Sequence, residues 1–270
     1  MPENLLQRLE FWFDTCPHAA IAFSGGVDSA VVAFLARRLL GRERVCAWIA
    51  DSPSLKRADL ALARDFAAQH DIPLRILQTR EMDNADYAAN AIDRCYHCKT
   101  TLYSSLQQEL ARQQPDAWVL SGANTDDLGD YRPGMQAAKE ARVHAPLIAC
   151  GVDKDGVRAL ARHFDLACAG KPASPCLSSR VPYGQAVTPE KLARIEAAEG
   201  WLQARGFPVC RVRHDQTTAR VEVPVAQVDA VQRLRPELEP ALLAMGFVDV
   251  IIDAEGFVSG KLNREIATHG

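Results

Sequence analysis

Six consecutive residues, Ser24-Gly25-Gly26-Val27-Asp28-Ser29, are of the types that bind phosphate groups. They follow an apolar run at 19–23 and precede apolar residues at helical spacing over 31–39. The free amides at a helix N-terminus point at a ligand, and the helix dipole favours its negative charge. Glycine lets the backbone approach closely. The segment therefore predicts a phosphate-binding turn, in which Asp28 helps to hold Mg²⁺ and the phosphates are bound by Ser24, Gly25, Gly26 and Ser29. The structural alternative is a tight turn that Asp28 or Ser29 caps.

Three cysteines form the second candidate site. Cys95 and Cys98 make a C-x-x-C pair, and Cys176 lies in a proline-rich stretch far along the chain. Thiols at i and i+3 can share one face of a helical turn, and a distant cysteine can join them. Three thiolates suit a [4Fe–4S] cluster with one open iron, or a zinc site whose fourth ligand is His97. A redox pair, or unconnected thiols, are the alternatives. The remaining five cysteines are predicted to be packing residues: Cys16, Cys46, Cys150, Cys168 and Cys210.

The elements that position these residues follow an alternating pattern. Apolar runs predict strands at 19–23, 45–50, 73–77 and 117–120, and helical spacing predicts helices at 3–15, from Ser54 onward, and around 102–110. Alternating strands and helices imply an α/β fold, with a parallel sheet covered by helices on both faces. Because ligands bind beyond the carboxyl ends of such strands, we expect Asp51, Ser52 and Gly122 to join the phosphate-binding turn in one nucleotide site.

The pattern changes after a loop at 170–187 that is rich in glycine and proline. Thr188-Pro189 indicates a helix start, with threonine as the cap and proline in the first turn. A hairpin is predicted at 209–215 and 219–224, helices near 226–234 and 236–245, and a strand at 248–252. We therefore predict two domains: an α/β domain at 1–185 and a small α+β domain at 186–270.

Composition narrows the class of protein. The chain has 270 residues, 48% of them apolar, and a net charge of −3. Slight acidity gives no basic field for nucleic acid, so a nucleic-acid partner is not expected. No apolar run approaches the about 18 residues of a membrane span, and the N-terminus lacks the basic start of a signal peptide. We expect a cytoplasmic protein with reduced thiols that forms a homo-oligomer.

Five segments together resemble one family. They are Phe23–Ser29, Asp130-Tyr131-Arg132-Pro133-Gly134, Cys176–Gly184, Arg211-Val212-Arg213 and Gly256–Gly260. They resemble the LarE family, the ATP-dependent sulfur transferases of nickel-pincer nucleotide biosynthesis, which belong to the PP-loop ATP pyrophosphatases. The resemblance implies an adenine nucleotide alpha-hydrolase-like domain. It also implies a small nucleotide substrate, pyridinium-3,5-biscarboxylic acid mononucleotide, whose carboxylate is adenylated by ATP and converted to a thiocarboxylate.

The family has two sources of sulfur. In some members a single cysteine, at the position of Cys176, gives up its own sulfur. Those members lack cysteines matching Cys95 and Cys98, which this chain has. The resemblance therefore implies the other branch, in which three cysteines hold a [4Fe–4S] cluster that delivers sulfur. Sacrificial transfer from Cys176 stays the alternative, and the sulfur donor is unknown.

The resemblance also assigns residues in the second half of the chain. Arg211 and Arg213 would bind the substrate phosphate, and their i, i+2 spacing puts both on one face of a strand. Arg180 would lie near the substrate, and Glu199 and Asp229 near a bound metal. The structural alternative for these charged residues is ordinary ion pairing.

Other functions remain open for the same phosphate loop. A tRNA-thiolating enzyme would need a basic surface, and an amidating enzyme would consume ammonia or glutamine. A zinc-stabilised module that binds a nucleotide without catalysis is the third alternative.

Overall fold

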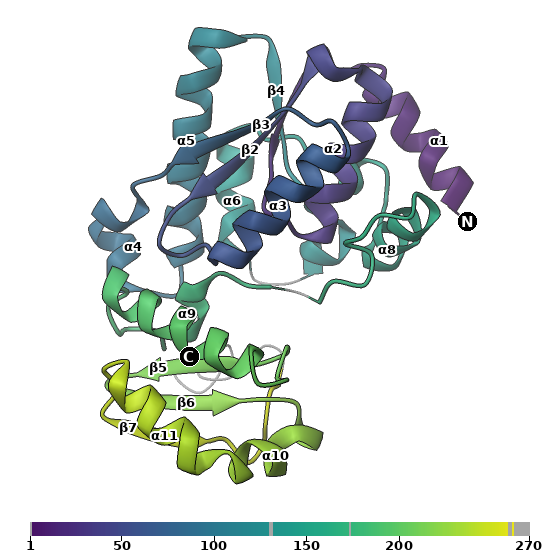
Figure 1. Ribbon diagram of the computed structural model, residues 1–270. Helices are drawn as coiled ribbons and strands as arrows, with labels where there is room; N and C mark the ends of the chain where they lie inside the picture. Colours follow the sequence, from purple (N-terminus) through teal and green to yellow (C-terminus); the bar gives the residue numbers. More distant parts are fainter. Residues whose placement is uncertain (1, 130–131, 173, 259–260, 262–270) are drawn as a thin grey trace. The chain divides into compact units, whose positions relative to one another are not determined.

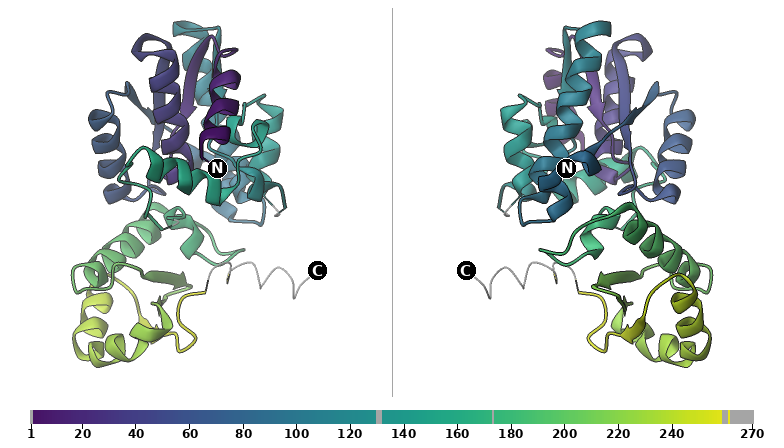
Figure 2. Two further views of the ribbon diagram at one scale, coloured as in Figure 1. Left: turned by 90° about the vertical axis from the view of Figure 1, so that its right-hand side faces the viewer. Right: turned by 90° about the vertical axis from the view of Figure 1, so that its left-hand side faces the viewer.

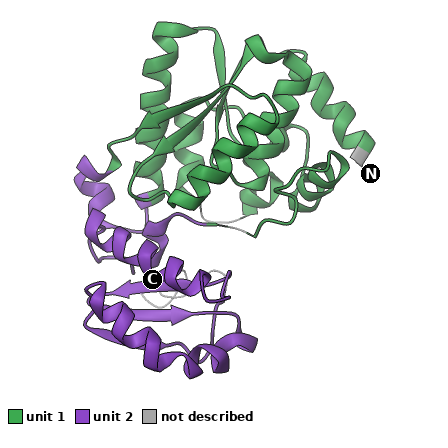
Figure 3. Cartoon of the chain, in the orientation of Figure 1, with its two compact units in different colours: residues 1–81, 95–174 green, residues 82–94, 175–270 purple. Residues whose placement is uncertain are grey.

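The computed structural model describes residues 2–129, 132–172, 174–258 and 261 (Figure 1). They form two compact units, which we describe separately. The first unit comprises residues 1–81 and 95–174, and the second comprises 82–94 and 175–270 (Figure 3). The domain boundary predicted at 185/186 stays a prediction, whereas the compact units divide the chain at 81/82, 94/95 and 174/175. Residues 130, 131, 259 and 260 of the family-like segments lie outside the described residues.

The first unit is built on a parallel sheet with strand order β3-β2-β1-β4. Its strands are β1 (His18–Ala22), β2 (Val45–Asp51), β3 (Leu74–Gln78) and β4 (Ala117–Leu120). Its helices are α1 (Pro2–Phe13), α2 (Val27–Leu40), α3 (Arg57–Gln69), α5 (Arg94–Gln113), α6 (Pro133–Glu140), α7 (Pro146–Ala149) and α8 (Lys154–His163). No helix in the described part of the chain is long and apolar enough to cross a membrane. The predicted α/β fold with a parallel sheet is confirmed.

Helices cover both faces of this sheet (Figure 2). In and just after β1, Ala19, Ile21 and Phe23 belong to a buried cluster that includes residues of α1, α2 and α8. Ala20 and Ala22 belong to a second cluster with residues of α5 and α6. Successive side chains of a strand point to opposite faces, so an uninterrupted apolar run is what a strand buried on both sides requires.

The third helix begins later than its apolar pattern suggested. A helix was predicted from Ser54, but α3 begins at Arg57. The Leu55 amide donates to the Ser52 carbonyl in a turn, and the Ser54 hydroxyl lies 2.8 Å from that of Ser52 and donates to buried Glu81 at 3.1 Å. These local hydrogen bonds of serine compete with helix formation.

The second unit contains a three-stranded sheet with order β5-β6-β7. Its strands are β5 (Arg211–Asp215), β6 (Thr218–Glu222) and β7 (Asp249–Ile252), and its helices are α4 (Ala85–Ala89), α9 (Pro189–Gln203), α10 (Val228–Arg233) and α11 (Arg235–Ala244). β5 and β6 form the predicted antiparallel hairpin, and β7 runs parallel to β6. Thr188 caps α9 as predicted, because its hydroxyl accepts from the Lys191 amide at 3.3 Å.

The segment 82–94 joins the second unit through a buried side chain that no sequence pattern identified. Asn90 is 0% exposed and has a left-handed backbone with φ of 58°. Its side-chain amide donates to the carbonyls of Val181, Pro182 and Gln185 at 3.2, 2.7 and 2.9 Å. Asparagine tolerates this backbone conformation better than most residues do. These bonds attach the segment to the chain that follows Cys176.

Candidate functional site

The first unit brings two loops together at the carboxyl edge of its sheet. The chain passes from β1 outward to β2 and β3, then returns to the other side of β1 as β4. β1 and β4 are therefore neighbours whose following connections diverge, and open α/β sheets bind ligands at such a reversal. The loops that follow these strands are residues 23–29 and 121–124. The topology therefore supports a phosphate site at the predicted turn.

The turn at 24–29 is closed by its own serines. The hydroxyl of Ser29, which is 4% exposed, accepts from the Ser24 amide at 3.2 Å and donates to the Gly26 carbonyl at 3.1 Å. Gly25 has φ of 70°, and Gly26, which precedes α2, has no side chain to cap the helix. Ser29 thus holds the loop together, whereas Ser24 is exposed and its hydroxyl lies 3.1 Å from that of Ser29.

Gly122 is required by packing against this turn. An ideal Cβ at Gly122 would lie 2.5 Å from the Ser29 amide nitrogen and 2.8 Å from the Ser29 Cα. Backbone atoms in a helix cannot move away cheaply, so no side chain fits at this position. The end of β4 consequently lies directly against the first turn of α2.

Asp28 is held by Lys154, which sequence patterns did not identify, and by Asn124 of the loop after β4. Lys154, the first residue of α8, donates to the two carboxylate oxygens of Asp28 at 2.8 and 2.6 Å. The Asn124 side-chain amide donates to the Asp28 Oδ1 at 3.1 Å. Asp153 caps α8 by accepting from the Gly156 amide at 2.7 Å, so a capping signal in the sequence could have located this helix and its lysine. The predicted Mg²⁺ ligand is therefore paired with a lysine.

A second lysine contacts the turn directly. Lys171 donates to the Gly25 carbonyl at 3.2 Å and pairs with Asp59 of α3 at 3.0 Å. The Ser174 hydroxyl also donates to Asp59, at 2.7 Å. Burial alone would raise the pKa of Asp59, but the hydrogen bond from Ser174 and the hydrogen bond and charge of Lys171 outweigh burial and lower it. Asp59 therefore fixes a cation beside the phosphate loop.

Asp51 and Ser52 lie at the end of β2 and are both engaged within the protein. Asp51 pairs with Arg57 at 2.5 Å. Ser52 is 7% exposed and hydrogen-bonds Ser54, which in turn reaches Glu81. Their nucleotide contacts stay a prediction.

The three candidate cysteines lie on exposed or half-buried surface. Cys95 is exposed and Cys98 half-buried, and they are the second and fifth residues of α5 in the first unit. Cys176 is exposed and immediately precedes the short 3₁₀ helix η4 (Leu177–Arg180) of the second unit. Four of the five predicted packing cysteines are buried, and Cys46 is half-buried. In the described parts of the chain, no group of three or more His, Cys, Asp or Glu side chains is arranged to hold a metal ion.

Arg180 and Glu199 form a buried ion pair in the second unit. They are 0% and 2% exposed, and the guanidinium donates to the carboxylate at 2.8 and 3.2 Å. Asp229, the other predicted metal neighbour, lies exposed in the first turn of α10. Roles for all three toward a metal or a substrate stay predictions.

Arg211 and Arg213 alternate with buried residues on β5, as the i, i+2 spacing predicted. Arg213 is bonded to Glu222 at 2.9 and 3.0 Å. Arg211 lies over the Phe257 ring, 5.1 Å from its centroid, and burial, together with the charge of Arg180, lowers its pKa. A buried cation gains from an anionic partner, which is compatible with the predicted phosphate contact.

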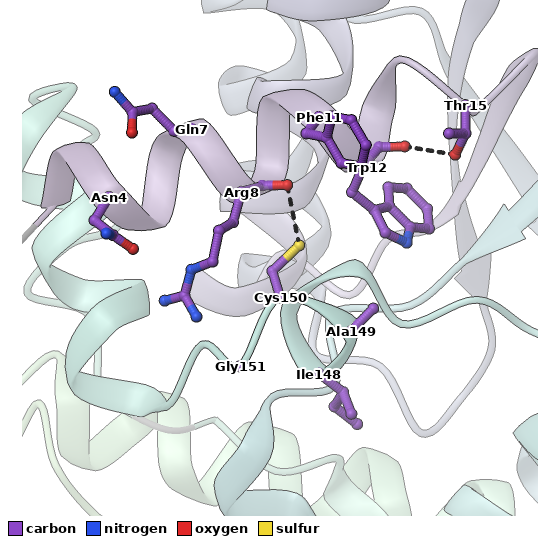
Figure 4. Close-up of a pocket in the computed structure, with 10 residues that line it drawn as sticks. All are labelled: Asn4, Gln7, Arg8, Phe11, Trp12, Thr15, Ile148, Ala149, Cys150 and Gly151. Atoms are coloured by element: carbon purple, nitrogen blue, oxygen red, sulfur yellow. Dashed lines mark hydrogen bonds between the residues drawn. The ribbon is translucent and has the colours of Figure 1, made fainter.

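Each unit has a cavity that could hold a ligand. One of about 190 Å³ in the second unit is lined by Arg213, Arg220 and Lys261 together with three acidic residues. The other, of about 780 Å³, lies between α1 and the segment 148–151 and includes Arg8, Trp12 and Cys150 (Figure 4). The smaller cavity has basic and acidic side chains in equal number, so its charge alone does not select an anionic ligand.

Gly122→Ala should disrupt the phosphate site. We expect a loss of about 1–3 kcal/mol in the free energy of unfolding, because the added methyl group overpacks a backbone contact. Pyrophosphate binding should weaken in parallel. Urea unfolding and calorimetric titration with pyrophosphate measure both effects. Gly129→Ala is the control, since nothing lies within 4 Å of its added carbon. Equal behaviour of the two variants would contradict the packing argument.

Thiol labelling should separate the exposed cysteines from the packed ones. Burial raises the pKa of Cys16 and Cys46 to about 11, so only about one thousandth of these thiols is ionised at pH 8. We expect iodoacetamide at pH 8 to modify Cys95 and Cys176 first, as read by peptide mass spectrometry. All eight cysteines should react after unfolding. Labelling of Cys16 as fast as Cys176 in the folded protein would refute the assignment.

Comparison with known proteins gives the family. The family described as NAD synthase matches residues 16–99, which include the phosphate loop. The chain is 44% identical over 266 residues to an uncharacterized protein of Synechocystis sp., covering 98% of both chains. It is 34% identical over 243 residues to the pyridinium-3,5-bisthiocarboxylic acid mononucleotide synthase of Lactiplantibacillus plantarum, covering 90% of this chain and 88% of the relative. At this identity and coverage, the chain belongs to the LarE family of PP-loop proteins.

Proposed function

We propose that this protein is an ATP-dependent sulfur transferase that acts on pyridinium-3,5-biscarboxylic acid mononucleotide. The observation that carries the proposal is a phosphate loop at the sheet reversal in a chain of the LarE family. Two lysines next to this loop, Lys154 and Lys171, supply the positive charge that a triphosphate needs.

The chemistry follows from the low reactivity of a carboxylate. Its negative charge repels nucleophiles, and oxide is a poor leaving group. An oxygen of the substrate carboxylate attacks the α-phosphorus of ATP, the bond to the β-phosphate breaks, and pyrophosphate leaves. A sulfur nucleophile then attacks the carboxyl carbon, and AMP leaves with the former carboxylate oxygen. The products are a thiocarboxylate, AMP and pyrophosphate.

The residues of the first unit fit ATP and Mg²⁺. Uncapped amides at the start of α2 suit the phosphate oxygens, and the Asp28 carboxylate is a ligand type that Mg²⁺ prefers. Asp28 is paired with Lys154 at 2.6 Å. With Mg²⁺ held by Asp28, Lys154 would be available to the phosphates.

The cysteines fit an iron–sulfur cluster by their chemistry. Cys95 and Cys98 stand in one helical turn, and with Cys176 they offer thiols on accessible surface. Three thiolates leave one iron of a [4Fe–4S] cluster open, and when bound the cluster would supply sulfur to the activated substrate. We propose these three as its ligands, on the basis of the family resemblance.

In the second unit, we propose that Arg211 and Arg213 face the phosphate of the substrate. The cavity beside Arg213 is also lined by Arg220 and Lys261. Glu222 pairs with Arg213 and Asp253 with Lys261, so a substrate phosphate would bind side chains whose positive charge is partly neutralised. A cytoplasmic location and a homo-oligomeric state remain part of the proposal.

The sulfur transfer itself is the first test. Protein reconstituted anaerobically, supplied with the biscarboxylic mononucleotide, MgATP and sulfide, should release AMP and pyrophosphate and give a product with sulfur in place of oxygen, read by mass spectrometry. Asp28→Asn should slow AMP release about a hundredfold, as for loss of one group that stabilises transition-state charge. Asp155→Asn, an exposed neighbour on α8, is the control. Equal AMP release with and without the substrate would contradict the proposal.

The cluster is the second test. Reconstituted protein should be brown, with absorption at roughly 400 nm. Cys98→Ala should lose this absorption and the bound iron, yet still bind MgATP. Cys46→Ala, the control, should keep the absorption and the iron. A colourless protein that transfers sulfur would overturn the cluster. If, in addition, Cys176 loses roughly 34 Da, the mass of hydrogen sulfide, its own sulfur is the source.

A further inference from the structure

Three guanidinium groups bind the backbone of the loop that carries Cys176. We call residues 175–180 the Cys176 loop. Arg180 donates through Nη1 to the carbonyls of Pro175 and Cys176 at 2.7 and 3.0 Å. Arg94 donates to the Ser178 carbonyl at 2.8 Å, and Arg213 to the Ser179 carbonyl at 2.9 Å. Four carbonyls of a short loop thus accept from Arg180 of the loop itself and from Arg94 and Arg213 elsewhere in the second unit.

Each of these arginines is itself fixed by an acceptor. Arg180 is bonded to Glu199, and Arg213 to Glu222, which is 1% exposed. Arg94, 3% exposed, donates to the Asn90 side-chain oxygen at 2.5 Å. A planar guanidinium presents several donors in a fixed geometry, so one side chain can hold an acid on one edge and a carbonyl on another.

The result is a fixed backbone beneath an accessible thiol. The Cys176 carbonyl accepts from the Ser179 amide at 3.0 Å and the Ser179 hydroxyl at 2.8 Å, in addition to Arg180. Cys176 itself is exposed. A reacting group gains in rate when its geometry is set beforehand by its surroundings.

We propose that Arg180 and Glu199 are positioning residues that hold the Cys176 loop, in place of the substrate and metal roles that the family resemblance implied. Glu199 Oε1 accepts from Arg180 Nε and from the Val212 amide at 3.2 Å, and Oε2 accepts from Arg180 Nη2. A metal ion at Glu199 would have to displace Arg180 and leave a buried charge without its partner, which is strongly unfavourable. The inference rests on the proposed function only in taking Cys176 as the functional thiol.

Hydrogen exchange of the Cys176 loop, followed by mass spectrometry, tests this role. The amides of Ser179 and of Val181, the residue after the loop, donate to the carbonyls of Cys176 and Ser178. In Arg180→Lys their exchange should accelerate at least about tenfold, because a single ammonium cannot hold Glu199 and two carbonyls together, and the loop opens locally. Peptides of α11 should exchange as in the wild type. The exposed pair Arg235–Glu239 is the matched control, as Arg235→Lys.

A second variant keeps the proposal testable if Arg180→Lys does not fold. Arg180→Met with Glu199→Leu removes both buried charges, an exchange that proteins often tolerate, and it should free the loop while MgATP binding stays unchanged. In protein active in sulfur transfer, Arg180→Lys should lower kcat without changing KM for ATP. Hydrogen exchange of the loop at the wild-type rate in both variants would overturn the proposal. A Glu199→Gln variant that loses Mn²⁺ binding while its loop stays protected from exchange would also overturn it. A wild-type protein inactive in sulfur transfer would instead refute the proposed function, since the exchange result does not depend on activity.

Discussion

The close approach of Gly122 to the first turn of α2 is the contact on which the first unit's candidate site depends. An ideal Cβ there would lie 2.5 Å from the Ser29 amide nitrogen. Because the end of β4 lies so near to α2, the Asn124 side chain two residues later reaches Asp28 at 3.1 Å. A glycine that binds nothing by itself thus sets the spacing of the groups that would bind a phosphate and its metal ion.

The two lysines beside the phosphate loop are each paired with a carboxylate. Lys154 is paired with Asp28 and Lys171 with Asp59, at 2.6 and 3.0 Å. Two uncompensated lysines beside a helix N-terminus would repel each other and oppose the helix dipole. Pairing avoids that cost in the free protein and keeps both ammonium groups close to where a triphosphate would lie. The second unit follows the same rule, with Glu199 and Glu222 fixing the arginines of the Cys176 loop.

Local patterns explain what the sequence could predict. Apolar runs located the four parallel strands, and Thr188-Pro189 located the start of α9. Contacts between residues far apart in the chain explain what the sequence could not predict. Charged residues are almost never fully buried without a partner, and nothing in the sequence pairs Arg180 with a glutamate 19 positions away. The segment 82–94 was missed for the same reason, because Asn90 is stabilised by carbonyls about 90 residues further along the chain.

The fixed backbone of the Cys176 loop is compatible with both proposed sources of sulfur. Either route needs Cys176 held in place, which its braced backbone provides. Delivery through a cluster, as proposed, would also give a role to Cys95, which is exposed, and Cys98, which is half-buried, whereas buried cysteines serve packing. Loss of sulfur from Cys176 would leave a flat, unsaturated side chain on a loop stabilised by four arginine-bonded carbonyls. Those hydrogen bonds go to backbone carbonyls and not to the thiol, so they do not by themselves separate the two routes.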